Sequence, residues 1–241
     1  MKKLLTVLML LFVFADAYAQ EQNAFLLDKV LTQLKLNKKQ IHEPFYRSKV
    51  LPNEASRSVL VIPKYNVNET DEEGHNFFVF DAYVMLVDNK TGKILSKYVE
   101  KEAWTSDATV LSDIAIDTGL YQLDSKVRAF GIRVSYHGSS QPNPNSSTDL
   151  TLFINQNNTL KAILKNYQID RYSGEWDTRC AGEFEDVTGS IDMDKNNGFK
   201  NLIIKSKIKD TKSVWLNDDC KQNTSIKNST QYLKFNGKEY K

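Results

Sequence analysis

The stretch Phe77-Phe-Val-Phe-Asp-Ala-Tyr-Val-Met-Leu-Val87, written FFVFDAYVMLV, is apolar at almost every position. Successive side chains of a strand point to opposite faces, so a strand that is apolar throughout must be covered on both. Residues 88–92, DNKTG, favour a turn, and 93–99 form a second strand-sized run. The sequence therefore predicts a hairpin whose first arm is a central strand of a sheet.

Other strand-sized runs follow at intervals of about 10 to 15 residues, with turn residues between them. They cover residues 58–63, 110–116, 127–136, 150–154, 159–164, 202–208 and 231–235. This spacing predicts a mainly β protein, folded as an antiparallel β-sandwich or a curled sheet. Residues 138–149, rich in Pro, Asn and Ser, are expected to form a polar surface loop.

One segment near the N-terminus has helical periodicity instead. Its apolar residues recur three or four positions apart between residues 23 and 40, and they include Leu27, Val30, Leu31 and Leu34. This pattern predicts one N-terminal amphipathic helix, which needs a partner surface to bury its apolar stripe.

The first residues, MKKLLTVLMLLFVFADAYAQ, have the layout of a secretory signal peptide. Two lysines precede an apolar run from Leu4 to Phe14, and Ala17 and Ala19 form a small-residue cleavage site. We expect cleavage after Ala19. The protein is therefore expected to be exported, to the periplasm or the medium.

This reading divides the chain into a signal peptide over 1–19, a helix and linker over 20–44, and an all-β domain over 45–241. After the signal peptide, no stretch has the roughly 20 consecutive apolar residues that a membrane span requires. We therefore expect no integral membrane segment in the mature protein.

The charge balance bears on the class of partner. The chain has 32 basic and 30 acidic residues, and loss of Lys2, Lys3 and Asp16 with the signal peptide leaves 30 and 29, a net charge of +1. Nucleic-acid binding and polybasic membrane adhesion both depend on a strong field of one sign. We therefore expect no nucleic-acid partner.

Cys180 and Cys220 are the two cysteines of the chain. In an oxidising compartment they predict one disulfide, which closes a loop of about 40 residues. Two free thiols are the alternative. A zinc site is disfavoured because the pair lacks a CxxC motif and a nearby histidine.

The segment 191–205, IDMDKNNGFKNLIIK, resembles a calcium loop at first sight. Asp192, Asp194 and Asn196 alternate as the first oxygen ligands of an EF-hand do. The glycine arrives one position late, as Gly198, and the bidentate glutamate that should close the loop is replaced by Ile203. Calcium at Asp192, Asp194 and Asn196 is therefore the minor hypothesis, and a hairpin turn is the favoured one. No other cofactor is expected.

Acidic residues also gather around a tryptophan beside Cys180. Glu175 and Asp177 flank Trp176, and Glu183, Glu185 and Asp186 follow. A glycosidase uses two carboxylates across a cleft, and an indole ring can stack on a sugar. Trp176, Glu175 and Asp177 are therefore a candidate ligand surface. The structural alternative is a tryptophan packed against the disulfide, above a solvated acidic edge.

Four segments resemble an uncharacterised family of exported proteins of Gram-negative bacteria. They are 127–133 (VRAFGIR), 149–153 (DLTLF), 174–184 (GEWDTRCAGEF) and 198–202 (GFKNL). The resemblance covers roughly the C-terminal half of the chain. It implies a shared fold and an exported location, and it carries over no catalytic position.

These observations favour an exported, non-enzymatic protein that binds another molecule of the cell envelope, either a protein or a glycan. The chain contains no recognisable nucleophile motif, metal cluster or phosphate loop. Two alternatives remain open. One is a carbohydrate-active enzyme that uses the acids around Trp176, and the other is a calcium-stabilised carbohydrate-binding module that uses residues 192–201.

Overall fold

The computed structural model describes residues 21–194 and 198–241. Residues 21–34 are helical, and two 3₁₀ turns follow, η1 (Lys38–Gln40) and η2 (Glu43–Phe45). The strands are β1 (Arg47–Leu51), β2 (Glu54–Thr70), β3 (Asn76–Asp88), β4 (Ile94–Ser106), β5 (Thr109–Gln122), β6 (Arg128–Gly138), β7 (Asn145–Gln156), β8 (Thr159–Trp176), β9 (Gly182–Met193), β10 (Leu202–Leu216) and β11 (Asp219–Leu233). The predicted signal peptide lies outside the described residues.

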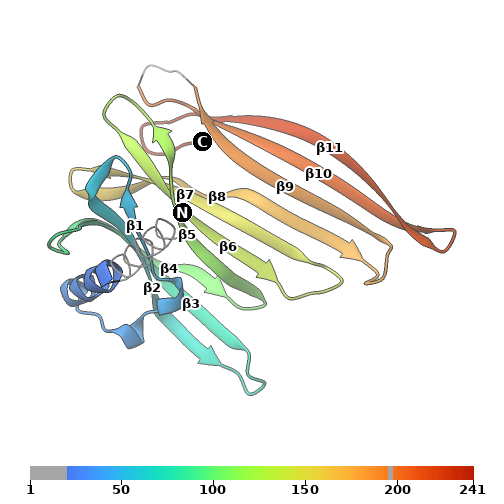
Figure 1. The fold of residues 1–241 in the computed structure, drawn as a ribbon, viewed down its shortest axis with the longest axis horizontal. Helices are drawn as coiled ribbons and strands as arrows, with labels where there is room; N and C mark the ends of the chain where they lie inside the picture. Colours follow the sequence, from blue (N-terminus) through green and yellow to red (C-terminus); the bar gives the residue numbers. More distant parts are fainter. Residues whose placement is uncertain (1–20, 195–197) are drawn as a thin grey trace, which may run out of the picture.

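The strands form two antiparallel sheets (Figure 1). Sheet A has the order β1-β2-β3-β4, and sheet B has the order β11-β10-β9-β8-β7-β6-β5. Within each sheet, every strand pairs with its neighbours in the sequence. The chain passes from sheet A to sheet B at the tight turn between β4 and β5.

The main core lies between sheet A and one half of sheet B. Its fully buried members come from both sheets and include Val59, Val61, Phe80, Val84, Ile114 and Ile132. The structure therefore confirms the predicted mainly β fold, with two antiparallel sheets packed face to face and one N-terminal helix.

The opposite face of sheet A is covered by the helix. Leu26, Val30 and Leu31 of the helix pack against Leu60 of β2 and Met85 of β3. Strand β3 is therefore buried on both faces, as its sequence predicts. The helix ends earlier than predicted, because Lys35 adopts a φ of 55°. The backbone N–H of Leu36 then donates to the carbonyl oxygen of Leu31 at 2.9 Å, which closes the last turn.

A second cluster covers the other face of sheet B. Leu150, Ile163 and Leu202 belong to it, and the chain after β11 folds back over them. The backbone N–H of Tyr240 donates to the carbonyl oxygen of Ile163 at 2.7 Å, and its hydroxyl donates to the carbonyl oxygen of Lys200 at 2.7 Å. These bonds fix the C-terminal segment on the sheet.

The predicted surface loop 138–149 is shorter than expected. Strand β7 begins at Asn145, and His137 of β6 pairs with Ser146. These polar residues form a strand because β6 and β8 bond to it on both sides, although Asn145 and Ser146 are exposed and residues 147–149 are only half-buried. Residues 139–144 remain as the connection.

Asp81 is a carboxylate buried in the middle of β3, with no solvent-exposed surface. The side chains of Lys101 and Lys64 lie 2.8 Å and 3.2 Å from its oxygens, and the backbone N–H of Glu102 donates at 3.1 Å. Glu102 has a φ of 52°, and the pairing register shifts here between β3 and β4. Asp81 therefore satisfies the backbone of a β-bulge.

We expect Asp81→Asn to lower the free energy of unfolding by about 1–3 kcal/mol, because the amide removes a charge that accepts three hydrogen bonds. Burial alone would raise the pKa of Asp81, but the bonds from Lys101, Glu102 and Lys64 outweigh it and lower the pKa. A lowered folded-state pKa stabilises the protein above the unfolded value, and this contribution disappears as the pH falls through the folded value.

Urea unfolding from pH 7 to pH 3 measures the difference in the free energy of unfolding between the wild type and Asp81→Asn. It should stay constant at higher pH and shrink below about pH 4, where the unfolded carboxylate becomes protonated. A difference that grows on acidification would contradict this role of Asp81.

Candidate functional site

The outer parts of β8–β11 extend beyond both cores as a sheet that we call the wing. It comprises residues 170–176, 182–188, 207–216 and 219–228. Figure 1 shows β9, β10 and β11 running far past sheet A. In β11, every side chain except that of Leu233 is exposed. The wing thus leaves most of both sheet faces open to solvent.

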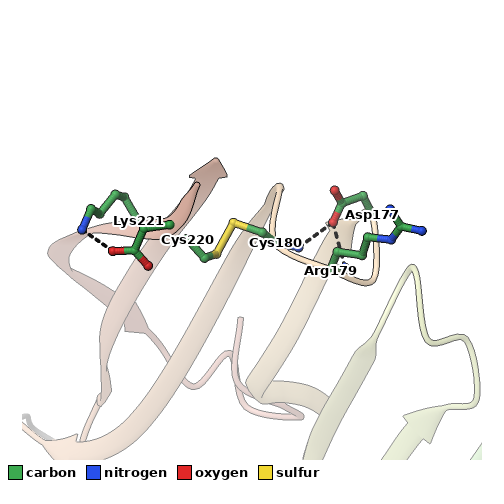
Figure 2. The surroundings of a disulfide bond; sticks show 6 residues. Asp177, Arg179, Cys180, Cys220 and Lys221 are labelled. Carbon is green, nitrogen blue, oxygen red and sulfur yellow. Dashed lines mark hydrogen bonds and ion pairs between the residues drawn. A yellow bond between two sulfur atoms is a disulfide. The ribbon is translucent and has the colours of Figure 1, made fainter. Parts of the chain in front are cut away.

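A disulfide ties the far end of the wing (Figure 2). It joins Cys180, in the turn between β8 and β9, to Cys220 at the start of β11, with 5.7 Å between their Cα atoms. The structure confirms the predicted pairing. The bond connects two successive hairpins across the sheet.

The candidate residue Asp177 shapes the turn that carries Cys180. Its carboxylate accepts hydrogen bonds from the backbone N–H groups of Cys180 and Arg179, at 2.7 Å and 2.9 Å. These bonds, with that of Cys180 as the larger effect, lower the pKa of Asp177. Figure 2 shows this carboxylate directed at the turn backbone. Asp177 therefore has a local structural role.

Trp176 and Glu175 do not share one ligand surface. They are adjacent in β8, so their side chains project to opposite faces of the sheet. The Trp176 ring lies 6.2 Å from that of Phe184, and its indole N–H donates to the carbonyl oxygen of Gln141 at 2.7 Å. We call this side of the wing the tryptophan face; Tyr172, Trp176, Phe184 and Trp215 belong to it.

Two glycines allow these rings to pack closely on the neighbouring strand. A Cβ atom at Gly182 would lie 2.3 Å from the Cβ of Trp176, and one at Gly174 would lie 2.3 Å from a ring carbon of Phe184. Gly182 pairs with Trp176, and Gly174 pairs with Phe184. The Phe184 ring thus covers Gly174, and the Cβ of Trp176 lies against Gly182, so both glycines have a packing role.

The acids predicted around Trp176 gather on the opposite side, which we call the glutamate face. Glu175, Glu183, Glu185 and Asp210 line an open trough of about 640 Å³ there. Glu175 and Glu183 are directly opposite one another in the β8–β9 pair. Like charges in this position destabilise a sheet.

Cross-strand cations neutralise most of these acids. Lys212 lies 2.6 Å from Glu183, Arg171 lies 2.5 Å from Glu185, and Lys227 lies 2.8 Å from Asp210. Glu175 has no ion-pair partner within residues 21–194 and 198–241. Glycoside hydrolysis needs carboxyl groups on opposite sides of the scissile bond, whereas these acids rise from one sheet face.

The end of the β10–β11 hairpin carries an apolar tip. Trp215 is one of the rings that could stack on a sugar, but its grouping with Val214 and Leu216 at the end of a hairpin was not predicted. Val214, Trp215 and Leu216 are 41%, 54% and 54% exposed. Trp215 belongs to the tryptophan face, and the other two belong to the glutamate face. The signal was available in the sequence as three consecutive large apolar residues before the Asn-Asp turn at 217–218.

The calcium hypothesis concerns the turn between β9 and β10. Strands end at Met193 and begin again at Leu202, as the hairpin interpretation predicts. The Asp192 carboxylate lies 2.5 Å from the ammonium group of Lys205, and the backbone N–H of Asp194 donates to Asn201. Asn196 lies outside the described residues. Among the residues that the structure describes, no group of three or more His, Cys, Asp or Glu side chains could hold a metal ion.

A further cleft of about 840 Å³ opens between the ends of the β2–β3 and β4–β5 hairpins. Phe77, Phe78 and Val110 supply apolar surface, and Asp71 and Asp107 lie on its lining. The Asp71 carboxylate accepts hydrogen bonds from the backbone N–H groups of its own turn, which gives it a local structural role.

Comparison with protein-family models, with curated proteins and with solved structures found no match to this chain. Within residues 21–194 and 198–241, no helix is long and apolar enough to cross a membrane. The function must therefore be inferred from the surfaces of the molecule itself.

The disulfide should stabilise the wing more than the body. We expect Cys180→Ser with Cys220→Ser to lower the free energy of local unfolding of the wing by roughly 3–4 kcal/mol, because the open loop gains conformational entropy when the wing unfolds. Amide exchange should also accelerate at residues 176–182 and 214–222, and should stay slow in β6. Hydrogen-exchange mass spectrometry measures both regions, and an equal acceleration in β6 would contradict a local role.

Gly182→Ala should destabilise the protein by about 1–3 kcal/mol, because the new methyl group overlaps the Trp176 side chain and the carbonyl oxygen of Glu175. Urea unfolding followed by tryptophan fluorescence measures the loss in the free energy of unfolding, and the fluorescence of the folded protein reports the displacement of the Trp176 indole. Ser190→Ala, an exposed change on the same strand, is the control. An unchanged midpoint for Gly182→Ala would show that Trp176 does not depend on this packing.

Proposed function

We propose that this chain is an exported, non-enzymatic interaction protein of the bacterial cell envelope, and that it binds a partner protein through the apolar tip of the wing. The observation that carries the proposal is the exposure of Val214, Trp215 and Leu216 at the end of a projecting hairpin. Exposed aromatic residues of this kind are typical anchors of protein interfaces.

The geometry of the tip favours a recess in the partner over a flat surface. Trp215 and Leu216 project to opposite faces of the hairpin, so a flat surface would cover only one of them. A recess that takes the end of the hairpin would cover both. The disulfide between Cys180 and Cys220 supports this mode, because a fixed hairpin loses less conformational entropy on binding.

Two features support an exported location. The disulfide is of a kind that persists in oxidising compartments. The N-terminal sequence has the predicted features of a secretory signal peptide. Both agree with a partner in the periplasm or outside the cell.

A glycan-binding or carbohydrate-active role is the second candidate. One observation favours it: Glu175, Glu183 and Glu185 line the same trough. This role would use the glutamate face and would not require the apolar tip. The calcium-stabilised module at residues 192–201 remains an untested prediction.

Substitution of the tip should separate these candidates. We expect Trp215→Asp to keep the wild-type melting temperature, because Trp215 is exposed, and to weaken partner binding by about tenfold or more. Leu120→Ser is the matched control: Leu120 is 75% exposed on β5, far from the tip in the sheet.

The partner is first identified with a photo-crosslinking amino acid at position 215 and, as a control, at position 120. The purified partner is then titrated with each variant. An adduct specific to position 215 and a lost affinity in Trp215→Asp are the expected results. Equal labelling at both positions would contradict the proposal. Glycan binding that depends on Glu183 and not on Trp215 would favour the second candidate.

A further inference from the structure

Strand β11 is an open sheet edge along its whole length. It pairs with β10 through fifteen consecutive residues without a register shift, and no described strand pairs with its other side. Its sequence, DCKQNTSIKNSTQYL, contains no proline and no glycine. A long and regular edge is a ready template for another strand.

The other three sheet edges are protected. Strand β1 has only five residues. Strand β4 has two register shifts against β3 and carries the charged run Glu100, Lys101 and Glu102. Strand β5 has two register shifts against β6 and packs against β1 and β4. Short strands, charges, irregularities and cover are the usual protections, and of these β11 has only three charged residues, Asp219, Lys221 and Lys227.

We propose that β11 pairs antiparallel with β11 of a second copy of this chain, with Asn223 opposite Asn223. This two-fold arrangement sets Asp219–Lys227 of one copy against the same nine residues of the other. It joins the two seven-stranded sheets into one continuous sheet. The interface is the same surface on both copies, as a two-fold dimer requires.

The charges of β11 select this register. Asp219, Lys221 and Lys227 are its charged residues. The two-fold axis at Asn223 places Asp219 opposite Lys227 of the second copy, twice by symmetry, and Lys221 opposite the neutral Ser225. A shift of the axis to Thr224 would instead place Lys221 opposite Lys227, which are like charges.

Backbone geometry also permits this register. Only alternate residues of an edge strand direct their N–H and C=O groups outward, and these must meet outward-directed residues of the partner. Asp219 and Lys227 are eight positions apart, an even spacing, so both belong to the same set. The nine opposed positions would then form about eight to ten backbone hydrogen bonds across the new pair.

The pairing leaves both faces of the wing open. Trp215 and Leu216 lie on β10, one strand in from the edge, so the apolar tips remain accessible. The antiparallel arrangement directs the two tips in opposite directions. The dimer is therefore independent of the proposed function, and would present two copies of the tip.

A charge-swap cycle tests the register. Lys227→Asp places two aspartates opposite one another at each end of the paired segment, and Asp219→Lys does the same with lysines. Each single change should raise the dimer dissociation constant by about tenfold. Because Lys227→Asp also removes the ion pair with Asp210 of the same chain, recovery of the dimer in the double variant is the result specific to the register. Ser229→Asp, on the same strand and beyond the paired segment, should have little effect.

Sedimentation equilibrium measures these constants. The proposal is overturned if the chain remains monomeric at about 100 µM. It is also overturned if the dimer dissociation constant is the same in the wild type, Lys227→Asp and Asp219→Lys. Trp215→Asp should leave the dimer mass unchanged. Failure of the dimer and failure of partner binding at the tip are thus separate results.

Cysteine crosslinking gives a second, geometric readout. Asn223→Cys should form an intermolecular disulfide under mild oxidation, because the two-fold axis brings position 223 beside itself. Ser229→Cys should not, because the same axis moves its two copies to about 40 Å apart, or twelve residues of strand. Equal crosslinking at the two positions, or none at position 223 in a dimer, overturns the arrangement.

Discussion

The limited reach of sheet A shapes the whole molecule. Four strands can cover only part of a seven-stranded sheet. Their inner face, with Phe80 and Val84, meets β5, β6, the end of β7 and the beginning of β8. The residues of sheet B at this contact include Ile114, Ile132, Phe153 and Leu160. The helix seals the other side of sheet A. No comparable layer reaches the outer parts of β9, β10 and β11 within the described residues, and these strands continue into solvent. The wing is the direct consequence.

A sheet without a core needs other sources of order. Exposed ion pairs such as Lys212–Glu183 contribute little individually, because water screens them. The wing depends instead on its uninterrupted ladder of backbone bonds, on the close packing of Phe184 over Gly174 and of Trp176 beside Gly182, and on the disulfide between the two hairpin ends. None of these elements needs a covering layer, so side chains such as Trp215 and Leu216 remain exposed.

The exposed surfaces of the wing differ in chemistry. The apolar tip favours a protein partner with a recess, the acidic trough around Glu175 and Glu183 suits polar ligands, and the regular edge of β11 suits another strand. The tip lies on β10 and the open edge is the neighbouring strand β11. The tip would bind through the side chains of Trp215 and Leu216, and the edge would bind through backbone groups. The two proposed interactions therefore do not compete for the same groups.

The sequence by itself determined the elements whose signal is hydrophobic. The doubly buried strand around Phe80 follows from its continuous apolar run. The apolar stripe of the helix follows from the three- to four-residue spacing of its apolar residues. The disulfide follows from the presence of two cysteines in a chain that is expected to be exported. The hairpin at 194–201 follows from its turn residues. Alternation along β8 also separates Trp176 from Glu175 once that strand is known. Only the tertiary structure decided the extent of β8 and β11, because strands exposed on both faces have no apolar alternation. Their limits come from backbone pairing with neighbours, and so do the wing, its tip and its open edge.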